Sequence, residues 1–113
     1  MDAASRQGSL YKAPEAVATV VYAARSLANI QRAFEFLHTK YTAAANNAVT
    51  AITSAIDNLA AHPLIGRRID RDLRELIISY GHSGYVAIYR FVIARDEVRI
   101  LAIRHQREMG YLP

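Results

Sequence analysis

The sequence lacks cysteine and tryptophan, and it carries only 3 prolines and 5 glycines among its 113 residues. Without cysteine the protein has no disulfide scaffold, no thiolate zinc site and no cysteine nucleophile. No apolar run approaches the roughly 18–20 residues of a membrane-spanning helix, and residues 1–9 lack the apolar core of a signal peptide. These absences favour a cytoplasmic protein with no membrane partner.

What the sequence does contain is enough apolar material for a folded core. Hydrophobic residues make up 52% of the chain, which excludes a wholly disordered protein. At 113 residues the chain accommodates one domain but not two. We expect a flexible N-terminal leader over residues 1–15 and a single domain over residues 16–113.

Positive charge is concentrated in the second half of the chain. The formal net charge is +4, and 12 of the 14 basic side chains are arginine. Nine of those arginines follow His62. Because arginine pairs bidentately with carboxylate or phosphate, this half is either an ordinary soluble basic surface or a binding surface for an acidic partner or a nucleic acid.

The apolar pattern predicts the order strand, helix, helix, strand, strand, strand. Ser26 is expected to cap the first helix, whose apolar residues recur every three or four positions. His62-Pro63 should end the second, because the residue before proline disfavours helical geometry. The predicted segments are a strand at Val17–Tyr22, helices at Ser26–Tyr41 and Ala43–Ala61, a charged loop at Leu64–Asp72, and strands at Leu73–Ser79, Tyr85–Ala94 and Val98–Gln106.

The strand at Tyr85–Ala94 is the most informative segment, because it is apolar at nearly every position. Alternate side chains of a strand face opposite sides of the sheet. One side would carry Tyr85, Tyr89, Phe91 and Ile93, and the other Val86, Ile88 and Val92. A strand that is apolar on both sides needs a cover on each.

Two helices are wide enough to cover only one face of such a sheet. The predicted fold is therefore α+β: a four-stranded, mainly antiparallel sheet with a two-helix hairpin on one face. The other face would stay uncovered and be closed by a partner protein. Arg95-Asp96 is expected to form a two-residue hairpin between the last two strands. The pattern does not say which side of the central strand faces the helices.

Several short motifs, in their order and spacing, resemble the RelE/ParE toxin superfamily of bacterial type II toxin–antitoxin systems. They are His62-Pro63-Leu64-Ile65-Gly66-Arg67, Leu73-Arg74-Glu75-Leu76, Tyr89-Arg90 and the run Ile100-Leu101-Ala102-Ile103-Arg104-His105-Gln106-Arg107. The resemblance extends from about Thr19 to Met109. It implies a strand–two-helix–three-strand fold, growth inhibition, and neutralisation by an antitoxin whose C-terminal segment wraps the toxin.

The superfamily divides by target, and the central strand favours one branch. RelE-like members cleave mRNA on the ribosome and commonly carry arginine directly after the position that matches Tyr85, where it stabilises phosphate charge. This chain has Val86 there, and an aliphatic side chain cannot stabilise charge at a scissile phosphate. The pair Tyr89-Arg90, the pair His105-Gln106 and the long helical hairpin resemble ParE-like members, which poison DNA gyrase. We therefore expect a gyrase inhibitor that is not an enzyme; the alternative is a ribosome-dependent, metal-independent mRNA endonuclease.

The candidate residues fall into three groups. Antitoxin contacts are predicted at Arg67, Arg68, Arg71, Arg74, Tyr85, Tyr89 and Phe91. Target contacts are predicted at Arg90, Arg104, His105, Gln106 and Arg107. If the chain is a ribonuclease, acid–base and phosphate chemistry would fall to Arg67, Arg71, His105, Arg107 and Tyr111.

Each group has an ordinary structural alternative. The arginines of the loop can be solvated surface, Arg90 can be paired with a carboxylate, and the three aromatic residues can belong to the core. The histidines have no metal-ligand spacing, so no metal or other cofactor is predicted. The expected partners are a ParD-like ribbon-helix-helix antitoxin with an acidic amphipathic tail and DNA gyrase, or the ribosome in the alternative; DNA is contacted only through the antitoxin.

Overall fold

The computed structural model describes residues 17–81 and 84–106. The leader predicted over residues 1–15 lies outside this part of the chain. The elements in chain order are β1 (Thr19–Tyr22), α1 (Ala24–His38), α2 (Thr42–Asp57), β2 (Arg67–Asp70), β3 (Leu73–Ile78), β4 (Tyr85–Val92) and β5 (Glu97–His105), with 3-10 turns at Asn58–Ala60 and Ile93–Arg95.

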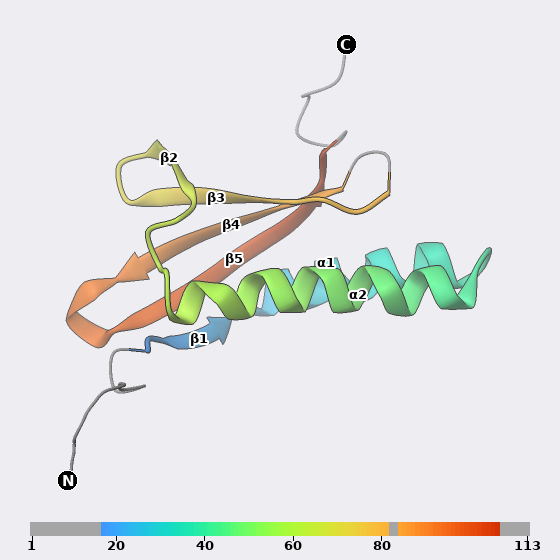
Figure 1. The fold of residues 1–113 in the computed structure, drawn as a ribbon, viewed down its shortest axis with the longest axis horizontal. Coiled ribbons are helices and arrows are strands. Elements are labelled where there is room, and N and C mark those ends of the chain that lie inside the picture. The colour runs from blue at the N-terminus through green and yellow to red at the C-terminus, as the bar shows by residue number, and fades with distance from the viewer. Residues whose placement is uncertain (1–16, 82–83, 107–113) are drawn as a thin grey trace, which may run out of the picture.

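The strands form one sheet in the order β1-β5-β4-β3-β2. β1 runs parallel to β5, and every other neighbouring pair is antiparallel. Both helices lie side by side along one face of this sheet (Figure 1). The predicted α+β architecture with a helical hairpin on one face is confirmed. No helix in the described residues is long and apolar enough to cross a membrane.

The sheet has five strands rather than the predicted four. The additional strand, β2, lies within the segment Leu64–Asp72 that was predicted to be a loop. All four of its residues are exposed, so it has no alternation of apolar and polar side chains to signal a strand. β2 is held by its pairing with β3 along the sheet edge, and edge strands need no buried face.

The first helix differs from the prediction at its start. α1 begins at Ala24, after Ala23 in extended geometry. Ser26, predicted as the cap, is inside the helix and buried, and its hydroxyl donates a hydrogen bond to the Ala23 carbonyl at 2.7 Å. A small side chain that satisfies its own hydroxyl lets the helix pack closely on the sheet.

The second helix follows its predicted face closely. Ile52, Ile56 and Leu59 are fully buried against the sheet, as their spacing indicates. The α-helix itself ends at Asp57 and continues as a 3-10 turn to Ala60, so the chain has left helical geometry before His62-Pro63.

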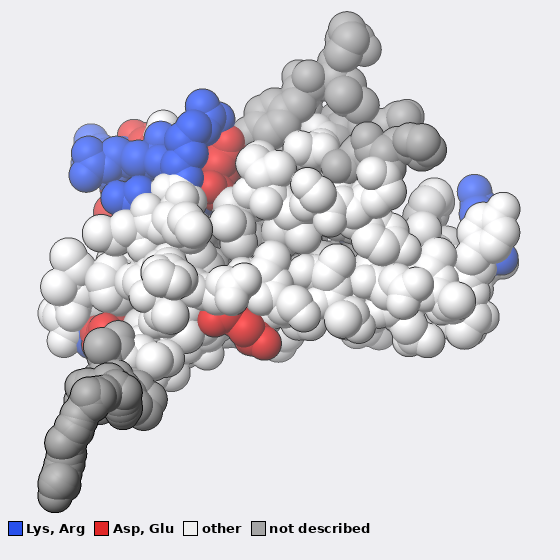
Figure 2. Space-filling view, viewed as in Figure 1, with Lys and Arg blue, Asp and Glu red and all other residues white. Residues whose placement is uncertain are grey.

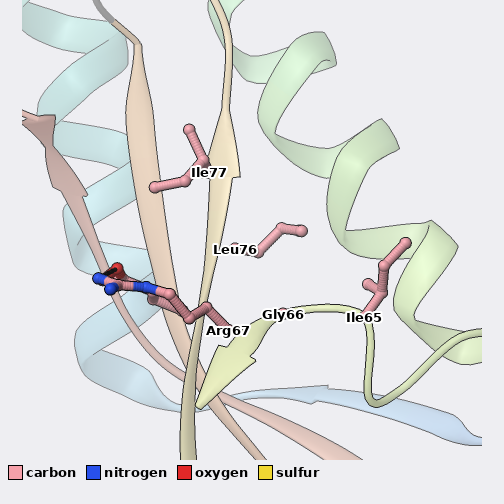
Figure 3. Close-up of a pocket in the computed structure, with 6 residues that line it drawn as sticks. Ile65, Gly66, Arg67, Leu76 and Ile77 are labelled. Carbon is pink, nitrogen blue, oxygen red and sulfur yellow. Dashed lines mark hydrogen bonds and ion pairs between the residues drawn. The ribbon is translucent and has the colours of Figure 1, made fainter. Parts of the chain in front are cut away.

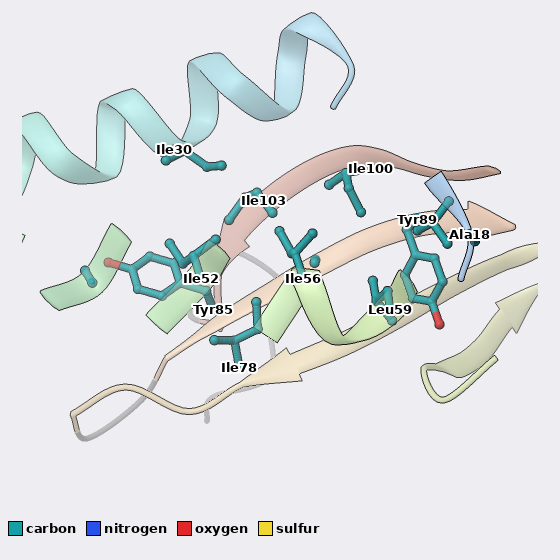
Figure 4. Packing of buried hydrophobic residues seen from close by; sticks show 13 residues of the cluster. Ala18, Ile30, Ile52, Ile56, Leu59, Ile78, Tyr85, Tyr89, Ile100 and Ile103 are labelled. Carbon is teal, nitrogen blue, oxygen red and sulfur yellow. The ribbon is translucent and has the colours of Figure 1, made fainter. Parts of the chain in front are cut away.

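The core lies between the helices and one face of the sheet (Figure 4). β4 contributes Tyr85, Ala87 and Tyr89 to the buried cluster, and Phe91 packs against it. The aromatic side of the central strand is therefore the inner side. Val86, Ile88, Arg90 and Val92 alternate with those residues and lie on the opposite side, which we call the outer face. Ile93, predicted to lie on the aromatic side, is in the turn after β4 and is exposed.

A bulge in β5 changes the phase of its side chains. Ile88 pairs with Ala102, but the next residue, Tyr89, pairs with Ile100, so Leu101 has no partner in the register. Both Ile100 and Ile103 can then point into the core although they are three positions apart.

The connection between β4 and β5 is longer than the predicted two-residue hairpin at Arg95-Asp96. Val92 pairs with Glu97, and a 3-10 turn over Ile93–Arg95 precedes Asp96, which has a φ of 51°. The apolar pair Ile93-Ala94 resembles a strand in sequence, but it lies in this turn.

Candidate functional site

Four arginines on the β2–β3 hairpin form a basic patch at one corner of the molecule. In Figure 2 lysine and arginine side chains gather over β2 and its turn into β3, next to acidic side chains of the same region. β2 is exposed along its length, and the turn residue Arg71 has a φ of 45°. This cluster, called the arginine hairpin below, consists of Arg67, Arg68, Arg71 and Arg74.

Tyr89, on the inner side of the sheet, holds the loop that leads into the hairpin. Its buried hydroxyl accepts a hydrogen bond from the Gly66 amide at 2.8 Å and donates one to the Pro63 carbonyl at 2.8 Å. The Arg74 guanidinium adds bonds to the carbonyls of Leu64 and Gly66 at 3.1 and 2.8 Å. Burial raises the pKa of the Tyr89 phenol, and the Gly66 amide and the Arg74 charge offset part of that rise. Arg74 is therefore held by backbone carbonyls, whereas Arg67 and Arg68 extend from the exposed strand.

Three arginines pair with carboxylates over the outer face and its margin. The pairs are Arg67 with Glu75 at 2.5 Å, Arg90 with Asp72 at 3.4 Å and Arg99 with Glu97 at 2.6 Å. Arg90 therefore has the carboxylate partner that the sequence analysis gave as its structural alternative, whereas its predicted role in target contact stays a prediction. Glu75 is only 2% exposed, so its charge needs a cation nearby. Much of the positive charge on this face is thus compensated within the molecule.

The outer face is not wholly bare, although neither helix covers it. Val86 of β4 and Ala102 of β5 are buried while lying outside the core cluster. Their partners in the register are Arg104 and Ile88 respectively. On β3, Ile77 beside Val86 remains 48% exposed. This face does not carry the three aromatic side chains of β4, because Tyr85, Tyr89 and Phe91 all face the helices.

These three aromatic residues, predicted as antitoxin contacts, instead follow the structural alternative and belong to the core. Tyr85 and Tyr89 are buried and Phe91 packs against the core, so they fill the space under the helices. The sequence alternation separates the two sides of a strand but does not say which side is inward. The Tyr89 side chain is fully buried and offers no surface for the predicted antitoxin contact. Arg67 and Arg68, predicted for the same contact, are exposed.

The residues considered for ribonuclease chemistry do not converge among the described part of the chain. His105 pairs with Tyr85 on the inner side, with ring centroids 5.4 Å apart in an edge-on arrangement. Arg67 bonds to Glu75 on the outer face, and Arg71 occupies the β2–β3 turn. The sheet itself separates His105 from Arg67. The other two candidates, Arg107 and Tyr111, lie outside the described residues.

The predicted target contacts are also divided between the two sides of the sheet. Arg104 is exposed and pairs with Val86 on the outer face. Arg90 lies on the same face, nearer the β4–β5 turn. Gln106 follows β5 and donates its backbone amide to the Gly84 carbonyl at 3.1 Å. Arg90 and Arg104 are therefore outer-face candidates, whereas His105 is not.

A groove of about 560 Å³ runs along the edge of β3 beside the arginine hairpin. In Figure 3 Leu76 points from β3 toward the side where Ile65 lies, and Ile77 points the other way. Ile65 is 63% exposed. We call this the edge groove; its lining is Ile65, Gly66, Arg67, Glu75, Leu76 and Ile77.

The sequence pattern does not predict the edge groove. The one available signal was Ile65, an apolar residue next to a charged segment, but a single exposed isoleucine is common on protein surfaces. Within the described residues, histidine and the acidic side chains form no group of three that could hold a metal ion.

Comparison with known proteins gives a consistent family. Residues 20–110 match the family model of the ParE toxin of the type II toxin–antitoxin system parDE. The chain is 38% identical over 86 residues to Toxin RelE3 of Caulobacter vibrioides, an alignment that covers 76% of this chain and 88% of that protein.

Solved structures have the same fold at low sequence identity. The chromosomal ParDE toxin–antitoxin system of P. aeruginosa matches with a TM-score of 0.67 at 18% identity, over 79% of this chain and 96% of that one. The RelBE2 toxin–antitoxin complex of Mycobacterium tuberculosis matches with a TM-score of 0.56 at 18% identity, over 79% of this chain and 98% of that one.

Proposed function

Because this chain belongs to the ParE/RelE toxin family of type II toxin–antitoxin systems, we propose that it arrests bacterial growth by poisoning DNA gyrase. It acts by binding, without catalysis of its own. Contacts to the target come from the outer face of the sheet, where Arg90 and Arg104 are the first candidates among the described residues.

The observation that carries this proposal is the separation of the groups that RNA cleavage would need. General acid–base catalysis requires a proton donor or acceptor within hydrogen-bond reach of the reacting oxygen, beside a cation for the phosphate. Here His105 packs on Tyr85 on the inner side of the sheet, while Arg67 bonds to Glu75 on the outer side. On the outer face beside Arg104 stands Val86, which offers neither charge nor a proton.

One observation favours the second candidate, a ribosome-dependent mRNA endonuclease. The relative at 38% identity carries the name RelE3. The family resemblance implies that RelE-like members cleave mRNA on the ribosome. For that function the chemistry would have to assemble around Arg107 and Tyr111, since His105 lies beside Tyr85 on the inner side of the sheet.

The proposed partner is a cognate antitoxin. Two solved neighbours are toxin–antitoxin assemblies, and this chain offers a basic hairpin beside an apolar groove. An antitoxin with acidic residues fits the arginine hairpin, so raising the salt concentration should slow association by screening the charges. In this proposal the antitoxin also carries the DNA-binding part, so the toxin contacts no DNA directly.

The test measures both targets with the same purified protein. Gyrase supercoiling should be lost and cleaved DNA should accumulate, while primer extension on translated mRNA should show no new ends. An Arg104→Ala variant serves as the probe, because Arg104 is exposed on the outer face and its loss should weaken inhibition of gyrase without unfolding the chain. Codon-positioned mRNA cuts together with unchanged supercoiling would overturn the gyrase proposal in favour of the ribonuclease.

A further inference from the structure

Only half of the edge of β3 that faces β2 is paired with another strand in the described residues. β2 is in register with Leu73, Arg74 and Glu75 alone. The remaining residues, Leu76–Ile78, pair with β4 on one side, and no strand of the described residues pairs with them on the other. Backbone donors and acceptors of a strand edge are a template for a further strand.

The edge groove provides apolar contacts beside this unused edge. Ile65 lies across the groove from Leu76 (Figure 3). An aliphatic side chain entering between them would remove exposed apolar surface on both partners, which stabilises a complex by about 25 cal/mol per Å² buried. The groove therefore suits a partner that alternates apolar side chains along an extended backbone.

The charge at one end of the edge groove restricts the partner further. Arg67 lines the groove, where Glu75 already pairs with it, and the exposed Arg68 follows it on strand β2. A second copy of this chain would bring a net charge of +4, whereas a segment with carboxylates would be attracted. A helical segment would satisfy its own backbone and leave the β3 edge unpaired.

We propose that an extended segment of the antitoxin adds to the sheet along Leu76–Ile78. Backbone hydrogen bonds to β3 hold the segment, an aliphatic side chain enters between Ile65 and Leu76, and a carboxylate lies toward Arg68. This inference rests on the proposed function, because it requires that an antitoxin exists. It adds to it the place of binding, the conformation of the bound segment and its side-chain pattern.

The test uses two exposed neighbours of which only one lines the groove. Ile65→Glu places a charge in the apolar contact, and Leu64→Glu places the same charge one residue away, outside the groove lining. Ile65 and Leu64 are 63% and 55% exposed, so neither change should unfold the chain. The probe is the full-length cognate antitoxin, with binding measured by titration calorimetry.

Ile65→Glu should weaken binding by roughly tenfold or more, because an unpaired charge is disfavoured in an apolar contact. Leu64→Glu and the conservative Ile65→Leu should stay near the wild-type affinity. Hydrogen exchange should show that the amides within Leu76–Ile78 that point away from β4 become protected when the antitoxin is added, with those of the opposite edge strand β1 as the internal reference.

The possible failures are distinguishable. If the antitoxin binds and neutralises the toxin, but Ile65→Glu has no effect and Leu76–Ile78 gain no protection, this inference is wrong and the proposed partner stands. Protection that rises with toxin concentration alone would assign the edge to a second copy and also overturn it. If the wild-type chain binds no antitoxin, the proposed function fails and the inference with it.

Discussion

A Cβ atom on Gly66 would lie 2.6 Å from both the hydroxyl and a ring carbon of Tyr89. The same two residues are joined by the hydrogen bond from the Gly66 amide to the Tyr89 hydroxyl. The glycine is needed here for space, since its Cβ would also lie 2.8 Å from the Glu75 carbonyl. This contact sets the height of the loop that carries Ile65 and Arg67, and so it shapes the edge groove.

Gly66→Ala should therefore destabilise the fold by about 1–3 kcal/mol, the usual cost of overpacking a tight site. The free energy of unfolding in urea measures it. Gly81→Ala is the control, because nothing lies within 4 Å of a Cβ atom there and only its φ of 63° is strained. A smaller loss at Gly66 than at Gly81 would contradict the close contact.

Tyr89→Phe should cost about 1–3 kcal/mol, because it leaves the Gly66 amide and the Pro63 carbonyl without their buried partner. Tyr80→Phe provides the comparison, since the Tyr80 hydroxyl makes one bond, to the Ala44 carbonyl at 2.8 Å, and should cost about 1 kcal/mol. Chemical denaturation at neutral pH separates the two. Equal losses in the two variants would show that the second hydrogen bond of the Tyr89 hydroxyl adds no stability.

Stability should fall in alkaline solution. Burial raises the pKa of Tyr89, and burial followed by the Asp57 charge raises the pKa of Tyr22. The unfolded chain therefore loses these protons first as the pH passes about 10, so the stabilisation is complete below that pH and is lost as the pH rises toward the folded pKa. Between pH 9 and about 11.5 the free energy of unfolding should fall less steeply with pH in Tyr89→Phe than in the wild type. Identical slopes would remove Tyr89 from this effect.

Arg71→Gly should stabilise the protein by up to about 1 kcal/mol, because Arg71 has a φ of 45°, where a side chain is strained and glycine is not. Arg68→Gly removes the same charge from strand β2 and should instead lower stability. Thermal unfolding of the two variants side by side tests the turn geometry. A loss at both positions would indicate that backbone entropy outweighs strain at Arg71.

Arg104→Ala should weaken inhibition of gyrase while leaving the melting temperature within a degree or so, since surface substitutions usually change stability little. Arg95→Ala is the charge-matched control, as Arg95 is exposed in the turn at the other end of the β4–β5 hairpin. Inhibition is measured as the protein concentration that halves supercoiling. If Arg95→Ala weakens inhibition equally, general charge rather than the outer face determines target binding.

Much of the fold followed from local pattern. The helical spacing of Ile52, Ile56 and Leu59 gave the inward face of α2, and the element order predicted two helices on one face of a sheet. The alternation in β4 correctly separated Tyr85, Tyr89 and Phe91 from Val86, Ile88 and Val92, because successive side chains of a strand must point to opposite sides.

Other features needed long-range contacts that no local pattern contains. β2 is a strand only because Arg67–Asp70 finds β3 beside it, and the β5 bulge at Leu101 exists because both Ile100 and Ile103 are drawn into the same core. Ser26 has a typical capping side chain, yet it is buried within the first turn of α1.

The sequence by itself determined the order of the elements other than β2, the two sides of the central strand β4 and the family to which the chain belongs. Only the tertiary structure decided that the aromatic side is the inner one, that His105 and Arg67 lie on opposite sides of the sheet, and that an unpaired β3 edge adjoins Ile65. The physical reason is that periodicity fixes the relative direction of neighbouring side chains, whereas the absolute direction depends on which surface the helices cover.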